Sequence, residues 1–93
     1  MKVLSQDEIK QKLGALRGWE ITPAGIQKRY ELDSFMSVIG LVNRVAEAAE
    51  KANHHPDMLI NYDKVTFTLI THDAGGITQK DFDLASRIDL LAT

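Results

Sequence analysis

The pattern of hydrophobic and polar positions predicts a helix near each end of the chain. Near the N-terminus, Ser5 and Glu8 have the spacing of a capping box, and apolar residues then recur at helical intervals until about residues 14–18. Near the C-terminus, Thr78 and Asp81 have the same spacing. The inward-facing positions of this last helix are expected to be Phe82, Ala85, Ile88 and Leu91 or Ala92.

A longer helix is predicted in the middle of the chain. Asp33 or Ser34 can cap its start, Asn53 can end it, and Pro56 prevents it from continuing. Its apolar stripe is wide and comprises Phe35, Val38, Ile39, Val42, Val45, Ala46 and Ala49. Met36 and Leu41 extend the apolar surface beyond that stripe, so we expect this helix to contact a second subunit as well as its own sheet.

Two pairs of short segments with strand-like patterns separate the helices. They cover residues 19–21, 26–32, 58–62 and 64–71. The segment Thr22-Pro23-Ala24-Gly25 forms the turn of the first pair, and Asp63-Lys64 is expected to form that of the second. The order helix, strand, strand, helix, strand, strand, helix predicts an α+β fold, with a four-stranded antiparallel sheet and helices packed on one face.

Composition and charge narrow the classes of function. Ninety-three residues suit a single domain over residues 1–93. The formal net charge is −2 and the basic residues are scattered, which argues against direct nucleic-acid binding. Without cysteine there are no disulfides, thiol catalysis or thiolate metal sites. Neither a signal peptide nor a run approaching the roughly 20 apolar residues of a membrane span is present, so we expect a cytoplasmic protein with no membrane partner.

All three histidines lie within residues 54–72, and histidine is the side chain best suited to move protons near neutral pH. His54 and His55 lie between a helix and a strand, where Pro56 makes a rigid corner. If the two following strands form one hairpin, His72 returns to the level of His55. The spacing therefore predicts that three imidazoles converge on one pocket.

Other interpretations of these residues remain open. Histidines near a helix end often interact with the helix dipole or with solvent. Three imidazoles can hold a zinc ion, but directly adjacent histidines seldom reach one ion and no fourth ligand is apparent, so no metal is expected. Glu50 lies one helical turn before His54 and could orient that ring, or it could be an exposed acid. Asp81 could simply cap a helix, and Asp73 could be a turn acid.

Two motifs make the chain similar to a known family. Glu50-Lys-Ala-Asn-His54-His55-Pro56, followed by Thr71-His72-Asp73-Ala74-Gly75-Gly76-Ile77-Thr78 and then Asp81, resembles pterin-4a-carbinolamine dehydratase. The likeness in length and element order covers nearly the whole chain. It implies a four-stranded antiparallel sheet backed by helices, assembled as a homodimer or homotetramer. It also implies that 4a-hydroxytetrahydropterin, such as 4a-hydroxytetrahydrobiopterin, is dehydrated to quinonoid dihydropterin without a further cofactor. That step regenerates the cofactor of aromatic amino acid hydroxylases.

The resemblance also implies roles for individual residues. The catalytic imidazoles would be His54, His55 and His72. The supporting acids would be Glu50 and Asp81, and the residues at the substrate would be Asn53, Pro56, Thr71 and Asp73. A carboxylate beside an imidazole favours its protonated form, so the spacing from Glu50 suggests His54 as the acid.

The chain departs from the family at three positions, with Met58 and Asp63 where many members have Trp and Asn, and Asn53 where several have Asp. Some members also serve as dimerisation cofactors of a homeodomain transcription factor. A non-enzymatic binding module of this coactivator type is therefore the alternative hypothesis.

Overall fold

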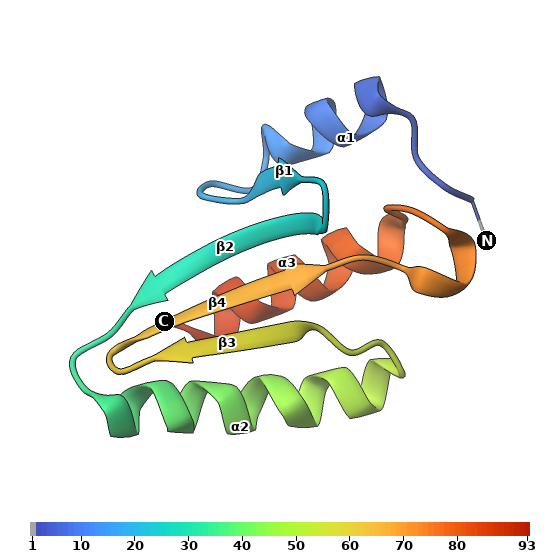
Figure 1. The fold of residues 1–93 in the computed structure, drawn as a ribbon. Helices are drawn as coiled ribbons and strands as arrows, with labels where there is room; N and C mark the ends of the chain where they lie inside the picture. The colour runs from blue at the N-terminus through green and yellow to red at the C-terminus, as the bar shows by residue number, and fades with distance from the viewer. Residues whose placement is uncertain (1) are drawn as a thin grey trace.

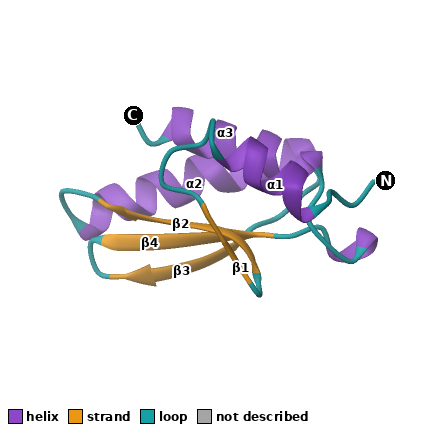
Figure 2. Cartoon of the chain, turned by 90° about the horizontal axis from the view of Figure 1, so that it is seen from above, coloured by secondary structure: helices purple, strands orange, loops and turns teal. Residues whose placement is uncertain are grey.

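The computed structural model describes residues 2–93, in which three helices lie on one side of a four-stranded antiparallel sheet (Figures 1 and 2). The elements are α1 (Gln6–Leu13), β1 (Glu20–Thr22), β2 (Gly25–Glu31), α2 (Phe35–Ala52), β3 (Asp57–Asn61), β4 (Lys64–Leu69), a 3-10 helix η1 (His72–Ala74) and α3 (Gln79–Leu91). This order and the α+β fold class confirm the prediction from the hydrophobic pattern. No helix within residues 2–93 is both long and apolar enough to span a membrane.

The strands lie in the order β1-β2-β4-β3, and every neighbouring pair is antiparallel. Alternate residues of the central strand β4 point toward the helices, and these residues are Val65, Phe67 and Leu69, all fully buried. The turn between β3 and β4 is one residue earlier than predicted. It consists of Tyr62 and Asp63, because Lys64 already pairs with Asn61 in the ladder and Tyr62 takes the positive φ of 55°.

Helix α2 begins and ends where the capping residues predict. The Ser34 side chain accepts a hydrogen bond from the Ser37 backbone N–H, and Asn53 adopts the left-handed conformation after the last turn. The assignment of Leu41 to an outer surface is wrong, because Leu41 is fully buried. It lies three residues after Val38 and four before Val45, so its side chain falls on the same inward side of the helix.

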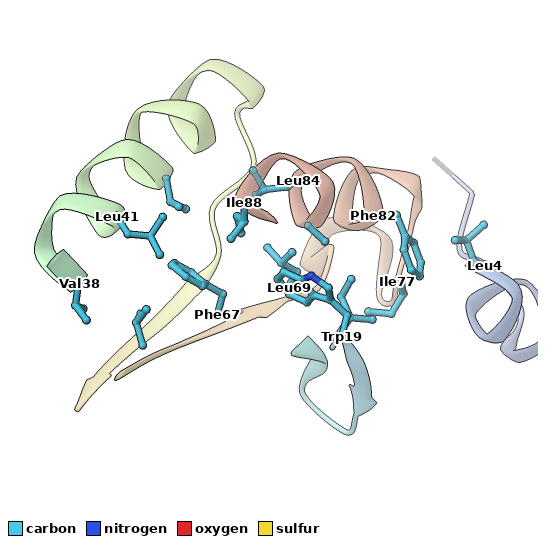
Figure 3. Close-up of a cluster of buried hydrophobic side chains, with 14 residues drawn as sticks. Leu4, Trp19, Val38, Leu41, Phe67, Leu69, Ile77, Phe82, Leu84 and Ile88 are labelled. Atoms are coloured by element: carbon cyan, nitrogen blue, oxygen red, sulfur yellow. The ribbon is translucent and has the colours of Figure 1, made fainter. Parts of the chain in front are cut away.

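The core lies between the sheet and the helices, and Figure 3 shows side chains of α2, β4 and α3 meeting there, with Leu4, Trp19 and Ile77 beside them. Trp19 is 4% exposed and belongs to this core. Both predicted capping boxes are present, one at Ser5 and Glu8 and the other at Thr78 and Asp81. The box at Asp81 fixes the N-terminal end of α3 beside the end of α2, where the candidate site lies.

Candidate active site

The C-terminal end of α2 sends the two adjacent histidines in different directions. Asn53 has φ 50° and ψ 43°, the His54 backbone N–H donates to the Ala49 carbonyl, and the Asn53 N–H donates to the Glu50 carbonyl. These two bonds form a Schellman motif, which reverses the chain at the helix end. His54 is consequently 9% exposed and lies against α3, whereas the side chain of His55 is 57% exposed.

A buried carboxylate holds the His54 ring. Asp81 is fully buried, and its Oδ1 lies 2.5 Å from His54 Nε2. Its other oxygen, Oδ2, accepts hydrogen bonds from the Thr71 hydroxyl and from the Thr78 backbone N–H, both at 2.9 Å. Because a carboxylate only accepts hydrogen bonds, this arrangement places a ring hydrogen on His54 Nε2, so in a neutral ring Nδ1 is the nitrogen that can accept a proton.

The segment after β4 is a compact loop that carries the third histidine. Thr71 and Gly76 pair across its base through the Thr71 N–H and the Gly76 carbonyl at 3.0 Å. Within it, His72 begins the short helix η1, and Gly75 closes the loop with a φ of 77° that side chains rarely tolerate. At Gly76 a side chain would collide with Val3, because an added Cβ would lie 2.8 Å from the Val3 Cγ1 atom.

These two segments meet around one pocket of about 310 Å3. In Figure 1, the end of α2 and the segment that follows β4 lie on the same side of the molecule. The pocket is lined by Asn53, His54, His55, Ile70, Thr71, His72, Asp73 and Lys80. The three imidazoles therefore converge, as the spacing of the histidines predicts. Their catalytic roles remain a prediction.

The remaining residues of the predicted site lie around this pocket and do not line it. Asp81 contacts the ring of His54, Glu50 contacts the ring of His55, and Pro56 is buried next to His55 in the chain. Sequence reasoning missed two lining residues, Ile70 and Lys80. The sequence could have indicated Lys80 as a lining residue, because it directly precedes the capping residue Asp81 in the first turn of α3.

The predicted partner of Glu50 is wrong. Glu50 Oε2 contacts His55 Nε2, whereas His54 contacts Asp81. The one-turn spacing from Glu50 to His54 would bring these side chains together only if the helix continued, and it ends at Ala52. The assignment of His54 as the acid depended on a contact with Glu50, and that contact is absent from residues 2–93.

The departures from the family pattern lie mostly outside the pocket. Met58 pairs with Phe67 on the face of the sheet that carries the core, and Asp63 lies in the turn at the other end of the hairpin. Asn53 is the only one of the three that lines the pocket. Within residues 2–93, no group of three or more His, Asp or Glu side chains is placed to hold a metal ion.

Comparison with known proteins decides the family. The model of the family described as pterin 4 alpha carbinolamine dehydratase matches residues 2–91. The chain belongs to this family. A relative from Roseiflexus sp., provisionally named pterin-4-alpha-carbinolamine dehydratase, is 55% identical over 86 residues, which are 92% of each chain. A relative from Cyanothece sp. with the same provisional name is 48% identical over 91 residues, covering 98% of this chain and 94% of the other.

Solved structures agree with this membership. The crystal structure of a transcriptional coactivator/pterin dehydratase from Brucella melitensis has a TM-score of 0.94 at 30% identity. That match covers 99% of this chain and all of the other. A pterin dehydratase-like protein described as a RuBisCO assembly factor of the alpha-carboxysome has a TM-score of 0.65 over 80% of this chain and 86% of the other. At 23% identity, that second likeness concerns the fold alone.

Proposed function

We propose that this pterin dehydratase converts 4a-hydroxytetrahydropterins, including 4a-hydroxytetrahydrobiopterin, to quinonoid dihydropterins by histidine acid–base catalysis. One observation carries the proposal: three imidazoles from two distant segments line one pocket, and carboxylates contact two of them. The product would be reduced again elsewhere, so the reaction would serve the recycling of a pterin cofactor.

The reaction needs two proton movements. The C4a–O bond breaks as the departing hydroxyl takes up a proton and leaves as water. The N5–H bond breaks as a base removes that proton, and its electron pair forms the C4a=N5 double bond. No oxidant, reductant or covalent intermediate is required, and a positioned acid and base each contribute about 10²–10⁴-fold.

The contacts suggest how the histidines divide these tasks. Asp81 holds the Nε2 hydrogen of His54, so a neutral His54 ring presents Nδ1 as a proton acceptor for N5. The His55 ring contacts Glu50 through Nε2, so an imidazolium there can give its Nδ1 proton to the departing hydroxyl. His72 makes no side-chain hydrogen bond within residues 2–93, and its exposed ring is available to the bound pterin.

A spectrophotometric assay with freshly generated carbinolamine tests the proposal. We expect the double variant His55→Ala, His72→Ala to lose about 10²–10⁴-fold of the enzymatic rate, because it removes the acid and a pocket wall. The matched control is Lys10→Ala, Gln11→Ala on the exposed side of α1, which should keep the wild-type rate. Equal rates in the wild type and the histidine variant would refute histidine catalysis.

We also propose that the protein is a homodimer or homotetramer. On α2, Phe35 is 44% exposed, and Ile39, Val42 and Ala46 are half-buried along the same flank. An apolar stripe left partly exposed on a chain of 93 residues favours association with a second copy.

A second candidate function is a non-enzymatic binding module of the coactivator type. It is favoured by the same apolar stripe and by the coactivator function named for the Brucella melitensis relative. The carbinolamine assay separates the two candidates, because a binding module would leave the spontaneous dehydration rate unchanged.

A further inference from the structure

A groove between α2 and α3 adjoins the candidate active site. It has a volume of about 620 Å3, twice that of the histidine pocket at about 310 Å3. His54 and Lys80 line both cavities, so the two are neighbours that share a wall. A ligand held among the histidines can therefore extend past these residues into the groove.

The groove is positively charged although the chain as a whole carries a net charge of −2. Its cations are Arg44, Lys51, Lys80 and Arg87, and its acids are Glu47 and Asp83. Within residues 2–93, none of these four cations lies within 4.0 Å of a carboxylate. Of the two acids, Asp83 already accepts a hydrogen bond from the Gln79 amide at 2.9 Å.

The walls of the groove are apolar between its charges. Ala48 and Ala52 come from α2, and Leu84 and Leu91 from α3. Figure 3 shows Leu84 on the part of α3 that lies toward α2. Arg44 also donates a hydrogen bond to the Leu91 carbonyl at 3.2 Å. A surface that alternates apolar patches with cations not paired to carboxylates fits a ligand that has both methylene groups and negatively charged groups.

The groove lies on the opposite flank of α2 from the apolar stripe Phe35–Ala46. Arg44 and Ala48 differ in position from Ile39 and Val42 by about half a turn of the helix, at roughly 100° per residue. Pairing of two copies through the stripe would therefore leave the groove open to a ligand.

We propose that the α2–α3 groove binds an anionic substituent of the pterin whose ring occupies the histidine pocket. The preferred substrate is then a pterin whose side chain carries carboxylates or phosphate, and Arg44, Lys51 and Arg87 determine this preference. The proposal rests on the proposed function, because it places the substrate ring among the three histidines.

The test compares carbinolamines with three different side chains. One side chain is a neutral polyol, one ends in a γ-linked diglutamate and one ends in a phosphate monoester. For the wild type we expect KM to be about tenfold lower for at least one anionic substrate, equivalent to about 1.4 kcal/mol. Whichever anionic substrate has the lower KM identifies carboxylate or phosphate as the ligand of the groove. In the variant Arg44→Gln, Lys51→Gln, Arg87→Gln this advantage should disappear, while KM for the neutral substrate should stay within twofold.

A variant with the same charge change elsewhere controls for the net charge of the protein. Lys10→Gln, Lys12→Gln, Arg29→Gln removes the exposed Lys10 and the half-buried Lys12 of α1 and the exposed Arg29 on the open face of the sheet, and it should keep the tenfold preference. An equal loss in both triple variants would overturn the groove proposal in favour of a general effect of net charge. Equal KM values for all three substrates in the wild type would overturn it directly.

A binding measurement keeps this proposal distinct from the proposed function. Calorimetry with the corresponding oxidised pterins, which cannot be dehydrated, should give the same order of affinities. Tighter binding of the anionic pterins without any dehydration would reject the enzymatic function and retain the groove. Dehydration of all substrates with equal affinity would retain the enzyme and reject the groove.

Discussion

At the scale of single residues, Asp81 links the stability of the fold to the orientation of the site. Its carboxylate accepts a hydrogen bond from the Thr78 N–H, which caps α3, and another from the Thr71 hydroxyl at the end of the sheet. The same carboxylate contacts the buried ring of His54. The capping role follows from the sequence spacing, but the contact with His54 does not, since 27 residues separate the two. A capping acid in this position is also a positioning residue for the proposed base.

The variant Asp81→Asn should therefore change the His54 ring as well as the stability. An asparagine can donate through Nδ2 to His54 Nε2, which would move the ring hydrogen to Nδ1 and remove the proposed acceptor. We expect kcat to fall about 10²-fold and the free energy of unfolding to fall by about 1–3 kcal/mol. Nitrogen-15 NMR of the His54 ring should show hydrogen on Nε2 in the wild type and on Nδ1 in the variant.

Asp83→Asn is the matched control, because Asp83 is exposed on the same helix and, within residues 2–93, its side chain hydrogen-bonds to Gln79 alone. With a neutral pterin it should leave kcat and the His54 spectrum unchanged. A His54 ring already protonated on Nδ1 in the wild type would contradict the assigned tautomer, whatever the rates.

At the scale of elements, the end of α2 determines which histidine points where. The left-handed conformation of Asn53 produces the Schellman bonds, and these direct His54 inward and leave His55 beside Glu50. Asparagine adopts this conformation more readily than other residues with a side chain, and glycine adopts it most readily. The helix end is thus a structural determinant of the site, separate from any contact between the Asn53 amide and a ligand.

Two substitutions at Asn53 separate these effects. Asn53→Ala should lower the free energy of unfolding by about 1 kcal/mol. The Cβ of alanine disfavours the left-handed conformation, and alanine lacks the local side-chain hydrogen bond by which asparagine tolerates it. Asn53→Gly should keep the wild-type stability in urea denaturation. If the Asn53 amide also contacts the pterin, the glycine variant will show a higher KM at unchanged stability. Equal destabilisation by alanine and glycine would contradict the conformational explanation.

A second connection between elements lies at the other end of α3. Asp89 accepts hydrogen bonds from Trp19 Nε1, Lys28 Nζ and the Tyr30 hydroxyl, which join α3 to β2 and to the residue before β1. Burial of Tyr30, together with its hydrogen bond to Asp89 and the charge of that carboxylate, raises the pKa of the Tyr30 hydroxyl well above its usual range.

The raised pKa of Tyr30 predicts a loss of stability in alkali. The folded protein keeps the Tyr30 proton, while the unfolded chain releases it above about pH 10, so unfolding becomes more favourable as the pH rises beyond that value. Melting temperatures measured between pH 9 and 11.5 should fall more steeply for the wild type than for Tyr30→Phe. Tyr62→Phe is the control, because Tyr62 is 74% exposed at a hairpin turn, and it should follow the wild type. Parallel curves for Tyr30→Phe and the wild type would exclude Tyr30 as the cause.

At the scale of the whole molecule, the sequence predicts whatever depends on local spacing. The element order, both capping boxes and the meeting of three histidines follow from periodicity and from the return of a hairpin. Errors arise where the outcome depends on contacts between distant segments or on the last turn of a helix. The Glu50 contact is an example, because the reversal at Asn53 transfers it to His55, whereas the inward side of Leu41 already follows from its spacing to Val38 and Val45.

Association of copies of this chain and catalysis by its histidines can be separated. All three histidines of the chain line the same pocket, and the apolar stripe of α2 lies away from the groove beside that pocket. Replacing Ile39 and Val42 by Asp should therefore yield a monomer of 10.4 kDa in light scattering, while the wild type has a multiple of that mass. Asn43→Asp, on the same helix but exposed to solvent, should keep the wild-type mass.

Because each chain holds its own three histidines, the monomer should retain the wild-type kcat per chain. A monomeric wild type would refute association through this stripe, and an inactive but folded monomer would mean that a second copy completes the site.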